Sequence, residues 1–304
     1  MQDQINLSTH IGRLSFSNPT ILASGIMDED AESIKRILHA GAGGIVTKSI
    51  GINSNKGHAN PTFVELDYGI LNAMGLPNPG IDEFKNELAK LKTITQPIIG
   101  SVYGKNENEF AKVALIMEQS GIKAIELNLS CPHASGYGLE LGQDPEMVHS
   151  ITQYVKKKVK IPVFVKLSSN VNNITLLAEA AANAHADAIV AINTVKAMAI
   201  NTEIQRPVLS HKTGGYSGKA IKPIGLRAVY DLHSQIEIPI IGVGGITTGI
   251  DVIEYFMAGA QAVEIGSAIY YRGITVFKDI CEEITQWLQT HNYNNIRDII
   301  GVAH

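Results

Sequence analysis

Cysteine is scarce in this chain, and that scarcity excludes several kinds of protein. Only Cys131 and Cys281 occur among 304 residues. Two thiols cannot build a disulfide framework, nor can they supply the four thiolates of an iron–sulfur cluster. We therefore expect a protein of a reducing compartment, the cytoplasm, that carries no such cluster of its own.

Long apolar runs and basic blocks are also missing. No segment approaches the ~20 apolar residues of a membrane-spanning helix, and the first residues lack the basic and apolar regions of a signal peptide. The net charge is −4, and the one cluster of lysines, residues 156–158, is interpreted as a solvated helix face. The sequence thus predicts neither membrane insertion nor a nucleic-acid partner.

Several catalytic motifs are absent as well. The histidines are scattered without the paired His/Glu spacing of a metal site, and no Gly-x-Ser-x-Gly elbow follows a strand. The chain has no Walker motif, and no Gly-x-Gly-x-x-Gly follows its first apolar run. We expect no bound metal, no serine triad, and neither a nucleoside triphosphate nor a dinucleotide as ligand.

What the sequence does contain is an alternation of short apolar runs and helical patterns. The runs are nearly continuous, as in strands buried on both faces, and stripes such as Phe110, Val113 and Met117 separate them. Eight runs predict a (β/α)₈ TIM barrel, formed by residues 1–304 as a single domain. They are Thr20 to Gly25, Gly43 to Ile50, Pro97 to Gly104, Ala124 to Ser130, Pro162 to Ser169, Ala188 to Thr194, Pro239 to Ile246 and Ala262 to Ile269.

The spacing of the runs predicts insertions at one end of the barrel. The gaps after the second, fourth and sixth runs are longer than the others. Loops that follow strands leave the C-terminal rim, where barrel enzymes build their active sites. We expect the segments Gly51 to Leu66 and Lys196 to Lys219 to form small hairpins or lids around that rim.

Glycine-rich turns end the last two runs. Gly242-Val243-Gly244-Gly245 closes the seventh run, and Gly266-Ser267 closes the eighth. Backbone N–H groups after these two strands are a common phosphate site in barrels. The pattern favours flavin mononucleotide (FMN) or a sugar phosphate as ligand.

Polar residues at the ends of other runs are expected to converge on the same rim. They are Ser24, Lys48, Asn128, Lys166, and Asn193 with Thr194. Burying unpaired lysines is costly, so two lysines at a barrel mouth indicate an electron-rich or anionic ligand.

The two cysteines differ in setting. Cys131 follows the fourth run in the segment Asn128-Leu129-Ser130-Cys131-Pro132-His133, ahead of a glycine-dotted loop, where a side chain can meet a ligand. It is either a catalytic residue or a small buried hydrophobe. Cys281 lies on the apolar stripe of the last predicted helix and is interpreted as structural.

These residues resemble one family over nearly the whole chain, the class 1 dihydroorotate dehydrogenases, and class 1B most closely. The resemblance is carried by Ala23-Ser24-Gly25, Thr47-Lys48, the stretch Leu71 to Gly80, Glu126 to Pro132, Val165 to Ser168, Ile192-Asn193-Thr194, Gly214 to Gly218 and the two glycine turns. It implies a TIM-barrel flavoenzyme of pyrimidine biosynthesis.

The resemblance also implies residue roles. FMN would be held by Ser24, Lys48, Ser49, Asn128, Lys166, Ile192, Gly218, Gly244, Gly245, Gly266 and Ser267, with the phosphate on the last four. Lys166 would stabilise the reduced flavin ring. Dihydroorotate would be bound by Lys48, Asn72, Ala73, Met74, Gly75, Leu76, Asn128, Asn193 and Thr194, and Cys131 would remove its C5 proton.

The sequence departs from the family at two positions. His133 and Ser101 stand where asparagine is common in the family, and residues 130–133 with 142–146 also resemble the flavin domain of dihydropyrimidine dehydrogenases, which reduce uracil and thymine. The retained Asn72 to Leu76 stretch favours dihydroorotate. A further alternative is a flavin-dependent reductase of uridines in transfer RNA, but the acidic net charge opposes binding to RNA. The alternative that is not an enzyme is a barrel that binds a phosphate ligand without redox chemistry.

Class 1B resemblance also implies a partner. Such catalytic chains usually pair with a subunit that carries FAD and a [2Fe-2S] cluster and passes electrons to NAD. Asn193-Thr194 favours this type over class 1A. A homodimer or a heterotetramer is expected, and fumarate stays an alternative electron acceptor.

Overall fold

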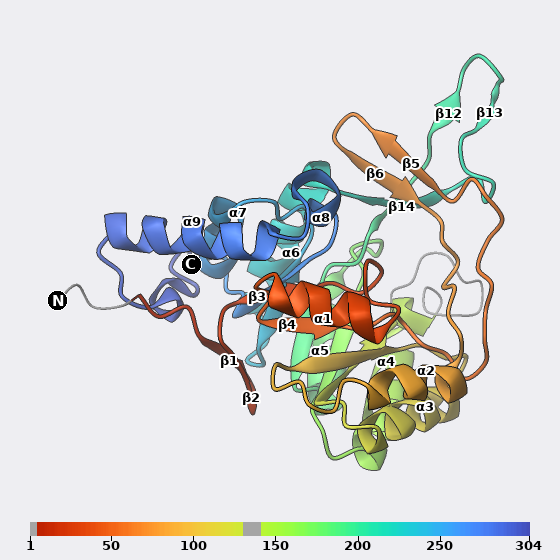
Figure 1. The fold of residues 1–304 in the computed structure, drawn as a ribbon, viewed down its shortest axis with the longest axis horizontal. Coiled ribbons are helices and arrows are strands. Elements are labelled where there is room, and N and C mark those ends of the chain that lie inside the picture. The colour runs from red at the N-terminus through yellow and green to blue at the C-terminus, as the bar shows by residue number, and fades with distance from the viewer. Residues whose placement is uncertain (1–4, 130–140) are drawn as a thin grey trace.

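The computed structural model describes residues 5–129 and 141–304, and its centre is a closed barrel of parallel strands (Figure 1). The strand order around the barrel is β10-β15-β16-β3-β4-β7-β8-β9. Each of the eight predicted runs contains one of these strands, so the predicted TIM barrel is confirmed. The strands are β3 (Thr20–Leu22), β4 (Gly44–Val46), β7 (Ile98–Val102), β8 (Ala124–Asn128), β9 (Val163–Leu167), β10 (Ala188–Ala191), β15 (Ile240–Val243) and β16 (Ala262–Ile265).

Helices follow the strands and cover the outside of the barrel. Side chains of Asp30, Asn106 and Thr248 cap the N-termini of α1, α3 and α7 by accepting backbone N–H bonds. Among the described residues, no helix combines the length and apolar character needed to cross a membrane. The helices are α1 (Ala31–His39), α2 (Ile81–Ala89), α3 (Glu107–Gln119), α4 (Pro145–Lys158), α5 (Ile174–Asn183), α6 (Lys222–His233), α7 (Gly249–Met257), α8 (Ala268–Arg272) and α9 (Val276–Thr290).

An N-terminal hairpin fills the barrel where its strands begin. Strands β1 (Thr9–Ile11) and β2 (Leu14–Phe16) pair antiparallel. Ile11 and Phe16 are buried in a cluster with interior residues of the barrel such as Phe164. Because this end is packed with apolar side chains, the carboxyl ends of the strands are left to form a site.

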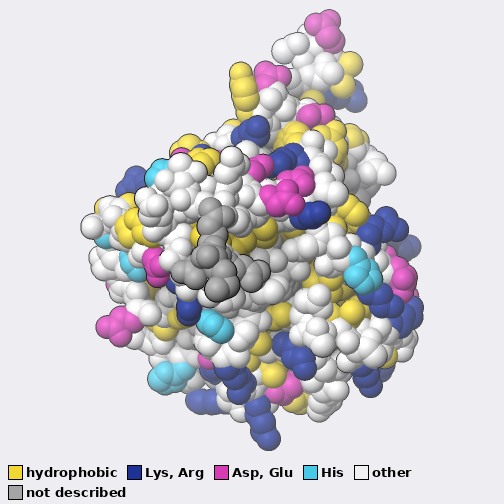
Figure 2. Space-filling model, turned by 60° about the vertical axis from the view of Figure 1, so that its left-hand side comes forward, with side chains coloured by type: hydrophobic (Ala, Val, Ile, Leu, Met, Phe, Trp, Pro, Cys, Tyr) yellow, Lys and Arg dark blue, Asp and Glu magenta, His cyan; other side chains and the backbone are white. Residues whose placement is uncertain are grey.

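The insertions after the second and sixth barrel strands join into one sheet. Strands β5 (Phe63–Leu66) and β6 (Gly69–Asn72) form a hairpin, which continues through β14 (Gly214–Ser217) to β11 (Val195–Ala197) in the order β11-β14-β6-β5. Between β11 and β14, strands β12 (Ile200–Asn201) and β13 (Arg206–Pro207) form a projection at the top of Figures 1 and 2. The predicted segment Lys196 to Lys219 contains the β12–β13 hairpin. The hairpin of the first insertion extends beyond the predicted segment Gly51 to Leu66, which includes β5 but not β6. The pairing of the two insertions was not predicted.

Candidate active site

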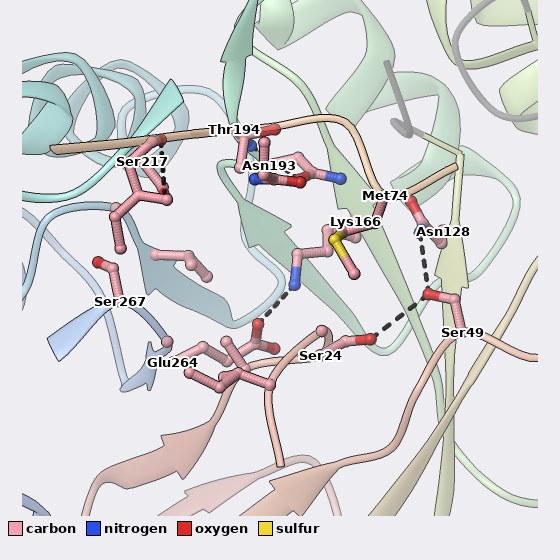
Figure 3. Close-up of a pocket in the computed structure, with 18 of the residues that line it drawn as sticks. Ser24, Ser49, Met74, Asn128, Lys166, Asn193, Thr194, Ser217, Glu264 and Ser267 are labelled. Atoms are coloured by element: carbon pink, nitrogen blue, oxygen red, sulfur yellow. Dashed lines mark hydrogen bonds and ion pairs between the residues drawn. The ribbon is translucent and has the colours of Figure 1, made fainter. Parts of the chain in front are cut away.

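A cavity of about 370 Å³ lies between the carboxyl ends of the barrel strands and the four-stranded sheet (Figure 3). Its volume is that of a small-ligand site. Most of the residues predicted to contact a cofactor or substrate line it, so the predicted convergence is found. These are Ser24, Lys48, Ser49, Asn72, Met74, Gly75, Leu76, Asn128, Lys166, Ile192, Asn193, Thr194, Gly244, Gly245, Gly266 and Ser267.

Two predicted contacts do not line the cavity. Ala73 is fully buried in a separate apolar cluster with Leu71 and Leu209. Gly218 packs against the β5–β6 turn, where an added Cβ would lie 2.7 Å from the Cα of Gly69. Both residues therefore stabilise the sheet above the cavity, and neither contributes to the cavity wall. Cys131 and His133 lie outside the described residues.

The glycine turns after β15 and β16 bring bare backbone to the cavity. Gly244 and Gly245 have positive φ angles of 129° and 68°. A Cβ on Gly245 would lie 2.7 Å from the amide nitrogen of Lys222 and 2.8 Å from the carbonyl oxygen of Gly218. Only glycine fits these positions without strain. Bare backbone therefore faces the cavity at these turns, where the sequence predicts the phosphate.

Hydroxyl and amide groups connect the ends of four strands, β3, β4, β7 and β8, on another side of the cavity. Ser49 Oγ accepts a hydrogen bond of 3.0 Å from Asn128 Nδ2 and lies 3.4 Å from Ser24 Oγ (Figure 3). It also lies 2.8 Å from Ser101 Oγ. Asn128 Oδ1 is buried and has no partner among the described residues. A ligand N–H group would supply the missing donor. Ser101 itself is fully buried beneath Ser49.

Lys166 lies at the floor of the cavity between two carboxyl groups. Its Nζ is 2.7 Å from Glu264 Oε2 and 3.5 Å from Glu126 Oε1, and all three side chains are buried. Burial raises the pKa of Glu126 well above its usual range, and the neighbouring Glu264 adds to this effect. Burial by itself would lower the pKa of Lys166, but the two carboxyl groups outweigh it and raise that pKa.

Lys48 also has a carboxylate partner. Its Nζ lies 3.0 Å from Glu29 Oε1, and the Glu29 side chain is 66% exposed. The buried Asp28 lies close by, and its pKa is raised to about 6 by burial, partly offset by Lys48. The prediction that Lys48 and Lys166 need an anionic ligand as their partner was therefore wrong, because Glu29 and Glu264 already pair with them. Because Glu29 is exposed, a ligand carboxylate can replace it at Lys48.

Sequence reasoning missed Glu264 as a site residue and quoted Glu126 only as part of a motif. Both line the cavity. The signal was present, because each is the single charged residue of its strand, β8 or β16. Such a residue in a fully buried strand requires a partner. Among the described residues there is no group of three acidic, histidine or cysteine side chains arranged to hold a metal.

Comparison with known proteins shows which family this chain belongs to. Residues 6–288 match the dihydroorotate dehydrogenase family. The chain belongs to the dihydroorotate dehydrogenase family. It is 53% identical over 302 residues to a protein of Methanocaldococcus jannaschii named dihydroorotate dehydrogenase B (NAD(+)), catalytic subunit, covering 98% of both chains. A Pyrococcus furiosus protein of the same name is 52% identical over 290 residues, covering 95% of this chain and 96% of the relative.

A solved dihydroorotate dehydrogenase has the same fold. The crystal structure of the Eimeria tenella enzyme in complex with ferulenol superimposes with a TM-score of 0.88, at 24% identity, over 100% of this chain and 90% of that one. The dihydroorotate dehydrogenase family thus accounts for the barrel, and the high-identity relatives are of the class 1B type that the sequence resembled. The family is one of flavin-dependent oxidoreductases.

Proposed function

We propose that this chain oxidises dihydroorotate to orotate in pyrimidine biosynthesis, with FMN as hydride acceptor. The observation that carries the proposal is the meeting of both predicted ligand sets in one cavity of a chain that belongs to this family. Residues 1–304 would act as a single FMN-binding domain. The two-cysteine composition favours a cytoplasmic location.

The cavity supports FMN as the cofactor on two observations. The turns at Gly244–Gly245 and Gly266–Ser267 offer backbone that can approach a phosphate, and a Cβ on Gly266 would have only Ala23 Cβ, at 3.5 Å, as a close neighbour. Asn128 Oδ1 is a buried acceptor without a partner among the described residues, and a ring N–H would satisfy it. Bound FMN would supply the hydride acceptor. Ser24, Lys48, Ser49, Ile192 and Gly218 would complete its binding, with Gly218 acting from behind the lining.

The substrate would lie beside the loop that follows β6. Asn72, Met74, Gly75 and Leu76, with Ala73 holding the loop from behind, would grip one side of the dihydroorotate ring. Asn128, Asn193 and Thr194 would offer donors and acceptors on the other. Lys48 would pair with the substrate carboxylate in place of the exposed Glu29.

Cys131 would take the proton from C5 of the substrate. A thiol has an ordinary pKa near ~8.5, so a modest lowering in the site would make its thiolate available at neutral pH. In the sequence, Cys131 follows the last residue of β8 by three positions, and barrel enzymes often carry catalytic groups in the loops after their strands. Lys166 would oppose the charge of the reduced flavin.

The names of the relatives support the proposal of a partner subunit. The M. jannaschii and P. furiosus proteins are named catalytic subunits of an NAD(+)-dependent enzyme. The chain's own two cysteines do not suffice for an iron–sulfur cluster. We propose a second subunit with FAD and a [2Fe-2S] cluster, and a homodimer or a heterotetramer as the assembly.

Anaerobic mixing tests the activity. The purified protein is first examined for bound flavin absorbance, and then mixed separately with dihydroorotate and dihydrouracil while flavin bleaching is followed. We expect dihydroorotate to bleach the flavin and dihydrouracil, which lacks the carboxylate that Lys48 would bind, to do so far more slowly. Equal rates would favour a dihydropyrimidine dehydrogenase-like activity. A protein that takes up no FMN would favour the phosphate-binding barrel without redox chemistry.

A further inference from the structure

The buried cluster of Glu126, Lys166 and Glu264 combines one cation with two carboxyl groups. The three residues come from neighbouring and opposing strands of the barrel, β8, β9 and β16. Their side chains are 0%, 6% and 0% exposed. Glu264 holds Lys166 at 2.7 Å, whereas Glu126 lies at 3.5 Å. One carboxylate is therefore enough to balance the lysine.

The hydrogen bonds of the two carboxyl groups are incomplete. Glu126 Oε2 and Glu264 Oε1 are buried, and neither has a partner among the described residues. Both carboxyl groups contact the same ammonium group, Lys166 Nζ, at 3.5 Å from Glu126 and 2.7 Å from Glu264, so they lie close together in the barrel interior. Two ionised carboxylates in this position would repel and leave both oxygens unsatisfied, whereas a single proton between them would supply the missing donor.

We propose that Glu126 and Glu264 hold one proton between them, so that the floor of the cavity carries no net charge, and that Glu126 is thereby a positioning residue for Lys166. Glu264, the closer partner of the lysine, is the ionised member, and Glu126 carries the proton. A doubly ionised pair would leave an uncompensated negative charge in the barrel interior, which is strongly unfavourable.

Among residues 5–129 and 141–304, the surroundings of Glu126 provide no second cation that would remove its proton. Lys166 faces it from β9 and Glu264 from β16, while β7 presents only the Ser101 hydroxyl, 3.5 Å from Oε1. Lys48, which lines the same cavity from the end of β4, is paired with Glu29. The charge state of the floor is thus set by the three residues themselves.

The shared proton has a consequence for the cofactor, and this part rests on the proposed function. Lys166 can stabilise the negative charge of a reduced flavin only if no more than one of the two neighbouring carboxyl groups is ionised. With one proton on the pair, the lysine has a single counter-ion. Loss of that proton would make the floor negative and would disfavour the reduced cofactor.

Infrared spectroscopy of the protein tests the shared proton without any use of activity. At pH 8, the wild-type protein is expected to show the C=O stretch of a protonated carboxylic acid, and Glu126→Gln to lose it. Asp28→Asn is the matched control, because Asp28 is also buried but has a pKa of about 6 and is ionised at pH 8. The control should keep the band.

Glu264→Gln is the decisive variant. With Glu264 neutral, Glu126 becomes the only counter-ion of Lys166 and should ionise, so the acid band should disappear although Glu126 is still present. A band that persists in Glu264→Gln would mean that burial alone protonates Glu126, and would overturn the pairing. Absence of the band in the wild-type protein at pH 8 would overturn the proposal outright.

Unfolding measurements cover the case in which Glu264→Gln does not fold. A folded-state pKa raised above that of the unfolded chain means that stability is lost as pH rises through the folded value. Relative to Glu126→Gln, the wild-type protein should therefore lose stability steadily as pH rises above 4.5, the ordinary pKa of the glutamate, until the folded value is reached. Equal pH dependence of the unfolding free energy in the two proteins would contradict the proposal.

The reduction potential of bound FMN then tests the consequence for Lys166. At pH 7, Glu126→Gln should keep the wild-type potential, because an amide reproduces the shape and charge of the neutral acid. At alkaline pH, the wild-type potential should fall more steeply than that of the variant, and identical slopes would refute the link to Lys166. A protein that binds no FMN would refute the proposed function and leave the infrared result standing.

Discussion

Cys131 is the residue whose replacement tests the proposed chemistry most directly. Cys131→Ala should bind FMN and orotate but reduce the flavin with dihydroorotate about 10²–10⁴ times more slowly, because no base remains to take the C5 proton. In the wild-type protein, the rate of flavin reduction should rise with pH until the thiolate is fully formed. Both are measured by anaerobic stopped-flow absorbance.

The second cysteine is the control for this experiment. Cys281 lies on α9, and burial raises its pKa to about 11, so it is not a thiolate at neutral pH. Cys281→Ala should therefore leave flavin reduction unchanged. A near-normal rate in Cys131→Ala would exclude that residue as the base.

Asp28 gives a prediction about the pH dependence of stability. Its pKa is raised by burial from 3.8 in the reference state to about 6, so the folded chain binds more protons than the unfolded chain between these values. Stability from this group is complete below pH 3.8 and is lost as pH rises through 6. Between pH 4 and pH 7 the loss should be on the order of 3 kcal/mol.

The variant Asp28→Asn isolates this contribution. Its neutral amide can still accept the 2.6 Å hydrogen bond that Gly25 N donates to Asp28 Oδ2. Denaturant unfolding of the cofactor-free protein at pH 4 and pH 7 should show a smaller loss of stability in Asp28→Asn than in the wild-type protein. Glu126 affects both proteins alike, so it cancels in the comparison.

At the scale of elements, the pairing of β6 with β14 connects the proposed substrate loop to the second insertion. Gly215 pairs with Asn72, and Asn72 Nδ2 donates a bond of 3.4 Å to Gly215 O. A Cβ on the neighbouring Gly214 would lie 2.4 Å from Asn72 O. Any side chain at Gly214 must therefore push the two strands apart.

Gly214→Ala should weaken substrate binding without loss of FMN. Overpacking of this kind costs about 1–3 kcal/mol, which corresponds to a KM for dihydroorotate raised by roughly tenfold. The phosphate turns lie on β15 and β16, so flavin content should not change. Ile204→Ser, in the β12–β13 projection where Ile204 is 61% exposed, is the control and should alter neither quantity.

At the scale of the whole molecule, the residues that pack the barrel and the residues that line the cavity lie at opposite ends of the barrel axis. Phe16 is 1% exposed at the packed end, where an added Cβ on Gly44 would lie 2.7 Å from its ring. The cavity is lined instead by residues at the carboxyl ends of the strands. A change at one end should thus leave the other end intact.

Phe16→Ala tests this separation. Removing a buried phenyl ring should lower the free energy of unfolding by about 3–5 kcal/mol, measured by urea denaturation. At temperatures where the variant is folded, flavin reduction by dihydroorotate should keep its wild-type rate. A rate that falls in proportion to stability would show that the two ends are coupled.

The sequence by itself determined the barrel and the face that carries the site. Continuous apolar runs are a local signal, and residues such as Asn128 and Lys166 could be assigned to one rim because parallel strands all end there. The helix capping residues Asp30 and Asn106 are local signals of the same kind.

Only the tertiary structure decided which side chains meet across the barrel. Lys166 and Glu264 are 98 positions apart in sequence, and their contact depends on strand order and register, which no local pattern encodes. The same holds for the β6–β14 pairing and for the burial of Ala73 in an apolar cluster away from the cavity, which residue type alone did not reveal. The charge of the cavity floor arises from these long-range contacts, because burial and the neighbouring carboxyl group set the ionisation of Glu126.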